Sequence, residues 1–135
     1  MSVTTNASEF VHRMQIRAEE VLRGTERTVR ATALAIDAAL VTSSPVDTGR
    51  FRANWLASVG VERFDIVEVG HADDKSISLA GYRLGDAIYL QNNLPYGARL
   101  NQGHSKQAPA GFVEAGVRAG EQVVRRSRLF NGGGE

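Results

Sequence analysis

Apolar side chains recur at steps of three and four residues along the N-terminal third of the chain. The repeat predicts a single amphipathic helix, because such steps place side chains on one helix face. Asn6 is the expected N-cap, Glu9 stands in the position of a capping box, and Pro45 marks the far end. The repeating positions are Phe10, Met14, Ala18, Val21, Leu22, Val29, Ala33, Ile36 and Leu40, with charged residues between them.

The length of this helix gives the first expectation about packing. Roughly 35 residues at about 1.5 Å each give a helix about 50 Å long, which exceeds the usual diameter of so small a domain. We therefore expect part of the helix to pack against something other than its own domain. The alternative is a break near Gly24, where glycine costs about 1 kcal/mol, giving two shorter helices that both pack internally.

A period of two follows the turn at residues 44–49 and predicts a β-hairpin. Residues 73–85 are mixed and polar, which fits either a short helix or an excursion on the surface. Residues 87–92 are a further strand candidate, closed by turn residues as far as Pro95. The hairpin pattern consists of Trp55, Ala57, Val59 and Val61, a turn near residues 63–65, and then Ile66, Val67 and Val69.

A second main helix is expected near the C-terminus. A short helical turn over residues 96–101 and a polar loop over residues 102–107 precede it, and Pro109 stands where a first helical residue is tolerated. The helix would continue through Ser127, and its Gly116 and Gly120 would let a neighbouring backbone approach, within the subunit or between subunits. Its apolar positions are Phe112, Val113, Val117, Val123 and Val124.

These elements predict an α+β fold, in which a long N-terminal helix and a C-terminal helix pack on a small, mostly antiparallel sheet. With 135 residues, the chain is long enough for one domain with its own core and too short for a second. We expect that domain over residues 1–130 and a flexible, glycine-rich tail over residues 131–135.

Composition narrows the classes of function. Sixteen basic residues against fifteen acidic ones leave a formal net charge of +1, which gives no strong field toward nucleic acid or anionic membrane. Cysteine is absent, which removes disulfides, thiolate zinc sites and cysteine nucleophiles. The sequence has neither a signal-peptide pattern nor a run of about 20 apolar residues, so we expect a soluble protein without membrane contact.

Catalytic and metal-binding patterns are weak. His12, His71 and His104 occur at no motif spacing, and we expect neither an enzyme nor a bound cofactor. Asp73 and Asp74 beside His71 offer oxygen and imidazole ligands for a divalent cation. Adjacent aspartates more often cap a following helix, so we expect no metal site there.

Basic side chains cluster near one turn and at the end of the C-terminal helix, where the helix dipole favours cations. One interpretation is solvated or salt-bridged surface. The other is contact with an acidic partner or with DNA. The clustered residues are Arg50, Arg52, Arg125, Arg126 and Arg128.

Two segments carry the most specific pattern in the chain. The first reads Ser-Pro-Val-Asp-Thr-Gly-Arg-Phe-Arg-Ala-Asn-Trp over residues 44–55. The second covers residues 88–111 and includes Asn-Leu-Pro-Tyr-Gly-Ala-Arg-Leu-Asn-Gln-Gly and then Gln-Ala-Pro-Ala-Gly. They resemble the two signature stretches of the phage neck and tail-completion family, which includes the minor tail protein Z type of lambda-like phages. The resemblance covers nearly the whole chain, and its main departure is Gly97, where that family has alanine.

Backbone chemistry explains why such residues would fix corners of a fold. Proline ends a helix, aspartate and threonine cap backbone amides, glycine permits turn conformations that other residues resist, and tryptophan anchors a strand. The expected structural motif residues are Pro45, Asp47, Thr48, Gly49, Arg50, Trp55, Asn93, Pro95, Tyr96, Gly103 and Pro109.

The resemblance implies a non-enzymatic virion protein of a long-tailed bacteriophage, placed in the neck or head-proximal tail and present in the host cytoplasm during assembly. It further implies a homo-oligomeric ring, hexameric to match the sixfold tail. That ring would join the head-closure or connector proteins to the tail-terminator or tail-tube proteins. The alternative is a DNA-contacting module of the neck channel that uses the arginine clusters, although recognised motifs and an aromatic stacking face are lacking.

Overall fold

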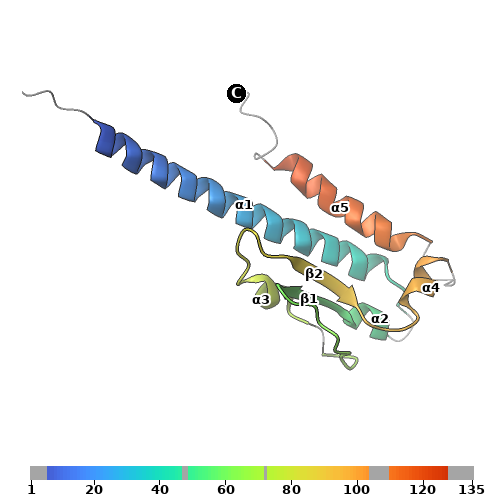
Figure 1. Ribbon diagram of the computed structural model, residues 1–135. Coiled ribbons are helices and arrows are strands. Elements are labelled where there is room, and N and C mark those ends of the chain that lie inside the picture. The colour runs from blue at the N-terminus through green and yellow to red at the C-terminus, as the bar shows by residue number, and fades with distance from the viewer. Residues whose placement is uncertain (1–5, 47–48, 72, 104–109, 128–135) are drawn as a thin grey trace, which may run out of the picture.

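The computed structural model describes residues 6–46, 49–71, 73–103 and 110–127, and the expected tail at residues 131–135 lies outside them. Its two long helices and small antiparallel sheet confirm the predicted α+β class (Figure 1). No helix in this described part is long and apolar enough to cross a membrane. The elements in chain order are α1 (Ala7–Ser43), α2 (Arg50–Ala53), β1 (Trp55–Val59), α3 (Lys75–Leu79), β2 (Ile88–Asn92), α4 (Gly97–Asn101) and α5 (Phe112–Arg126).

The N-terminal helix α1 is unbroken over 37 residues, which makes it about 55 Å long. The alternative break near Gly24 does not occur, because helix-favouring neighbours on both sides outweigh the cost of one glycine, about 1 kcal/mol. Asn6 is the N-cap as expected, but its side chain makes no cap hydrogen bond, so the predicted capping box is wrong. The reason is the backbone of Asn6, whose φ of −89° and ψ of 20° differ from the extended conformation of a capping residue.

The sheet pairs β1 with β2 in antiparallel register, from Trp55 opposite Asn92 to Val59 opposite Ile88. The strand at residues 87–92 is therefore confirmed, whereas the hairpin between residues 55–61 and 66–69 is wrong. Residues 61–69 contain no strand, and side chains rather than a backbone ladder attach this segment to β1. β1 thus finds its partner about thirty residues later in the chain.

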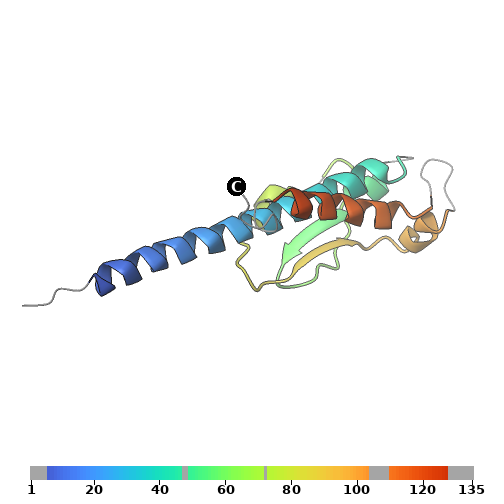
Figure 2. The ribbon, with the colours of Figure 1, turned by 90° about the horizontal axis from the view of Figure 1, so that it is seen from above.

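Helix α5 lies antiparallel along the C-terminal half of α1 (Figures 1 and 2). Gly116 and Gly120 face α1 and are buried. A Cβ atom on Gly116 would lie 2.7 Å from Leu40 Cδ2, and one on Gly120 would lie 2.5 Å from Ile36 Cδ1. The two glycines therefore permit a close helix contact, and it lies within the subunit.

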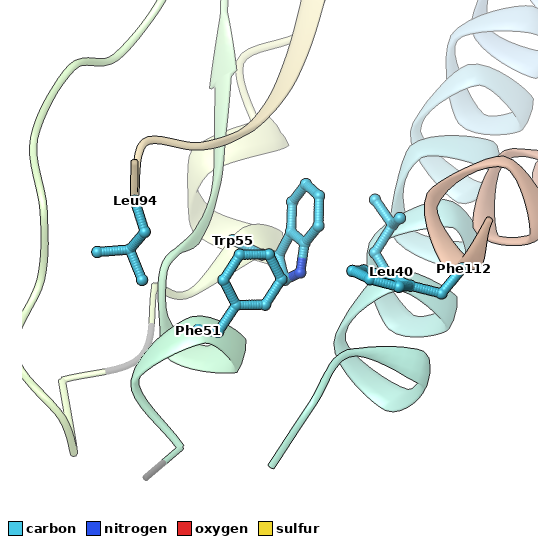
Figure 3. Packing of buried hydrophobic residues seen from close by; sticks show 5 residues of the cluster. All are labelled: Leu40, Phe51, Trp55, Leu94 and Phe112. Carbon is cyan, nitrogen blue, oxygen red and sulfur yellow. The ribbon is translucent and has the colours of Figure 1, made fainter. Parts of the chain in front are cut away.

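The core is concentrated where the C-terminal end of α1 meets α2, β1 and the start of α5 (Figure 3). The Phe51 ring packs edge-on against Trp55 at 5.9 Å and against Phe112 at 6.1 Å, an arrangement that aromatic pairs favour. Leu40 and Leu94 complete this cluster. A second, smaller cluster joins α1 to the sheet and α3, and contains Ala33, Ala57 and Leu79.

Candidate functional site

The first signature segment forms the corner between α1 and β1. Pro45 follows the last turn of α1, and Gly49 caps α2 with a φ of 75°, a left-handed conformation that favours glycine. Trp55 opens β1 at 6 % exposure, and its indole Nε1 donates to Ser44 Oγ at 2.8 Å. The expected roles of Pro45, Gly49 and Trp55 are confirmed, while Asp47 and Thr48 lie outside the described residues.

Arg52 closes the end of α1. Its Nε donates to the Ser44 carbonyl oxygen at 2.9 Å and its Nη2 to the Thr42 carbonyl oxygen at 2.8 Å. The last carbonyls of a helix have no intrahelical partner. A guanidinium that donates hydrogen bonds to them therefore stabilises the corner. The donors of Arg52 therefore act within the fold, which was not evident from its place in a basic cluster.

The second signature segment meets the first around Phe51. The Tyr96 ring lies 6.0 Å from the Phe51 ring, and Asn92 Nδ2 donates to the Phe51 carbonyl oxygen at 2.8 Å. A Cβ atom on Gly97 would come within 3.2 Å of Phe51 Cε2, so glycine eases the contact at this point. The two segments, far apart in sequence, thus form one joint.

The end of the second segment positions α5. Asn101 donates from Nδ2 to Glu114 Oε1 at 3.0 Å and accepts from the Val113 amide at 2.9 Å. Gly103 has a φ of 99° directly after the α4 turn. Pro95 is exposed before that turn, and Pro109 lies outside the described residues. The expected helical turn near residues 96–101 is confirmed as α4, and α5 begins at Phe112 with Gly111 as its N-cap.

The structure does not bring the basic clusters together. Arg50 begins α2 beyond the C-terminal end of α1, whereas Arg126 lies near Gly24, about 20 residues earlier along α1. At 1.5 Å per residue the clusters are about 30 Å apart along that helix. Arg125 is exposed in the last turn of α5, and Arg128 lies outside the described residues.

The aspartates beside His71 serve the fold. Asp74 is the N-cap of α3 and accepts from the Ile77 amide at 3.3 Å. Asp73 accepts from the Ala57 amide and from Arg63 Nη1, the latter at 2.7 Å. In the described ranges no group of three or more metal-ligating side chains gathers at one place. His12 and His71 are exposed, and His104 lies outside the described residues.

A buried charge cluster was not predicted from the sequence. Asp37, on the inner face of α1, is 8 % exposed, and its Oδ1 lies 3.9 Å from Lys75 Nζ, too far for a hydrogen bond. Burial raises the pKa of Asp37, Lys75 lowers it and Asp73 raises it further. Burial also acts to raise the pKa of Asp73, but hydrogen bonds from Arg63 and from the Ala57 amide hold it below its ordinary value. A single aspartate in an amphipathic repeat gives no sequence signal for such burial.

The N-terminal half of α1 is the largest feature without a packing partner in the described structure. Every residue from 6 to 23 is exposed, and this part extends past the end of α5 (Figures 1 and 2). Helical periodicity places most of its apolar side chains in one stripe that continues the face packed against α5 and the sheet, whereas the exposed Ile16 lies on the opposite side. Part of the helix therefore does not pack on its own domain, as expected, while its packing against something else stays a prediction. The stripe consists of Phe10, Val11, Met14, Ala18, Val21 and Leu22.

Comparison with known proteins gives no match to a family model, to a curated protein or to a solved structure.

Proposed function

We propose that this protein is a structural component of a long-tailed bacteriophage, which forms a ring at the neck or head-proximal end of the tail and joins the head connector to the tail. The observation that carries the proposal is the joint around Phe51, where the two segments that resemble the neck and tail-completion family pack on each other. Residues of a shared signature are expected to meet in space when their role is to define a common fold.

The exposed half of α1 supports an assembly role. Phe10 is 58 % exposed and Met14 is 55 % exposed, and both belong to a stripe about 20 Å long. Apolar stripes of this size on a soluble domain usually mark contacts with another protein. A virion component that is covered only after assembly would present such a surface.

The DNA-contacting alternative has less support. Its arginines lie in two places about 30 Å apart, and Arg52 donates to carbonyls of its own chain. A continuous basic groove would be needed to follow a nucleic-acid backbone.

Disruption of the gene in the genome that encodes the protein tests the proposal directly. We expect the lysate, viewed by electron microscopy, to contain DNA-filled heads and separate tails, and we expect the full chain supplied from a plasmid to restore joined virions. Intact virions at normal titre after the disruption would contradict the proposal. The absence of any tailed particle from the undisrupted genome would also contradict it.

The number of subunits is measured separately. Light scattering after gel filtration over a concentration series gives the mass of the purified protein. A stable hexamer would support ring formation as a property of the chain itself. A monomer at every concentration would mean that a neighbouring neck protein templates the ring.

A further inference from the structure

In the loop between β1 and α3, residues 60–71, the backbone of every second residue from Arg63 to Val67 is bonded by a side chain in or next to the sheet. The Arg63 amide donates to Gln91 Oε1 at 2.8 Å, and the Arg63 carbonyl oxygen accepts from Asn93 Nδ2 at 3.0 Å. The Val67 amide donates to Asn54 Oδ1 at 2.8 Å, and Asn54 Nδ2 donates to the Val67 carbonyl oxygen at 3.0 Å. Because Asn54 is fully buried, these bonds fix the loop as an extended segment.

The charges at the base of this loop are already paired. Arg63 contacts Asp65 Oδ2 and Asp73 Oδ1, each at 2.7 Å. The Arg63 side chain and the bonded backbone groups are therefore directed to the sheet, whereas two apolar side chains of the loop are left in solvent. Phe64 is 77 % exposed and Ile66 is 47 % exposed.

One face of the loop combines apolar and acidic side chains. In an extended segment, alternate residues share a face, so Glu62, Phe64, Ile66 and Glu68 lie on one side over about 20 Å. Two exposed glutamates thus enclose two exposed apolar residues. We refer to this set as the Glu62–Glu68 face.

The stripe on α1 has the complementary composition. At 100° per residue, Arg13 and Arg17 follow the edge of the stripe beside Phe10 and Met14. The stripe and its arginines extend along about 20 Å of helix, a length similar to that of the Glu62–Glu68 face. Apolar contact at the centre with opposite charges at the rim is the usual composition of a protein interface.

We propose that the free N-terminal half of α1 in one copy packs its apolar stripe on the Glu62–Glu68 face of a neighbouring copy. This inference rests on the proposed ring and names the two surfaces that meet in it. α1 leaves the domain at one end, and the loop lies below the sheet, away from α5 (Figure 1). Each copy therefore presents both surfaces at once. A contact between two different surfaces repeats from copy to copy and closes into a ring when the rotation permits.

Disulfide trapping between two single-cysteine variants tests this contact, since the native chain has no cysteine. Ala18→Cys places a thiol within the stripe, and Val61→Cys places one beside the Glu62–Glu68 face, both with little change in volume. Ile16→Cys is the matched control, because Ile16 is exposed, carries no charge and lies about 160° around the helix from Ala18. The variants are purified separately, mixed, oxidised and separated on a non-reducing gel, after circular dichroism has shown native helix content.

We expect the Ala18→Cys and Val61→Cys pair to form at least about five times more linked dimer than the Ile16→Cys and Val61→Cys pair, because docking raises the effective concentration of the two thiols. Equal yields, or no linked dimer, would overturn the inference. A yield dominated by Ala18→Cys linked to itself would also overturn it, since that would indicate pairing of two α1 helices. Each of these results leaves the gene-disruption experiment, and with it the proposed function, to be decided separately.

Discussion

Gly120 lies against Ile36 at a distance that leaves no room for a side chain, since a Cβ atom would stand 2.5 Å from Ile36 Cδ1 and closer still to Cγ1. Cγ1 is bonded to Cβ and moves only by rotation about χ1, which is restricted to one main rotamer for a β-branched residue in a helix. The contact thus sets the separation between α1 and α5. Two glycine substitutions with opposite expected effects on the free energy of unfolding can test it.

We expect Gly120→Ala to lower the free energy of unfolding by about 1–2 kcal/mol, because overpacking exceeds the gain in helix propensity. Gly24→Ala is the matched control on α1, where the nearest atom to a new Cβ is Arg27 Nη2 at 3.9 Å. It should raise stability by about 0.5–1 kcal/mol. Urea denaturation followed by circular dichroism measures both, and a stabilising Gly120→Ala would contradict the close contact.

The elements predicted from the sequence are those whose signals are local. The apolar repeat of α1 and the four-residue step between Gly116 and Gly120 each depend on residues within one helix. The partner of β1 was predicted wrongly because the segment over residues 66–69 has strand-like composition. The backbone N–H and carbonyl oxygen of Val67 in this segment bond instead to the side chain of Asn54, whose position depends on the tertiary fold.

The same distinction applies to the candidate site. Pro45 and Gly49 were expected at a corner because proline and glycine restrict or permit backbone conformations in any context. The role of Arg52 in closing α1 was missed, since it requires the chain to turn back on the helix. The burial of Asp37 was missed for a similar reason, because α3 covers it only in the folded chain.

Ser44 and Trp55 provide a second test. Removal of the hydroxyl in Ser44→Ala leaves the buried indole N–H without its acceptor, which should lower the free energy of unfolding by about 1–3 kcal/mol. Ser43→Ala is the control, because that hydroxyl bonds only to the Ala39 carbonyl oxygen one turn back. Chemical denaturation that finds equal losses for the two variants would show that the indole bond contributes nothing specific.

Asn54 should hold the 60–71 loop in place. In Asn54→Ala the Val67 amide loses its acceptor, and the Val67 and Arg50 carbonyl oxygens lose their donor. We expect a loss of about 3 kcal/mol and faster hydrogen exchange at the Val67 amide. Thr42→Ala, which removes an exposed hydroxyl bonded within α1, should leave exchange in the loop unchanged. Unaltered exchange at Val67 in Asn54→Ala would mean that other contacts fix the loop.

Asp37 makes stability depend on pH. Burial raises the pKa of Asp37 in the folded state above the ordinary value of 3.8. Protonated Asp37 therefore contributes fully to the free energy of unfolding at low pH, and this contribution is lost as pH rises through the raised pKa. Asp37→Asn should therefore stabilise the protein more at about pH 7 than at about pH 4. Lys75→Met should have the opposite effect at neutral pH, because Lys75 lowers the pKa of Asp37. Urea titrations at both pH values measure the difference, and identical effects of Asp37→Asn at the two would contradict the raised pKa.

The charges at the rim of the proposed contact give a prediction about specificity. Reversal of Arg13 and Arg17 to glutamate should weaken trapping between Ala18→Cys and Val61→Cys chains by about fivefold, because like charges would then face Glu62 and Glu68. Reversal of those two glutamates to arginine on the other chain should restore the yield, since the ion pairs form again with exchanged signs. High salt should reduce the difference between matched and mismatched pairs, because exposed charges are screened. A yield restored only when both surfaces carry reversed charges identifies the two surfaces as partners. An equal yield in all four combinations of native and reversed surfaces would show that the acidic residues of the loop do not face the arginines of α1.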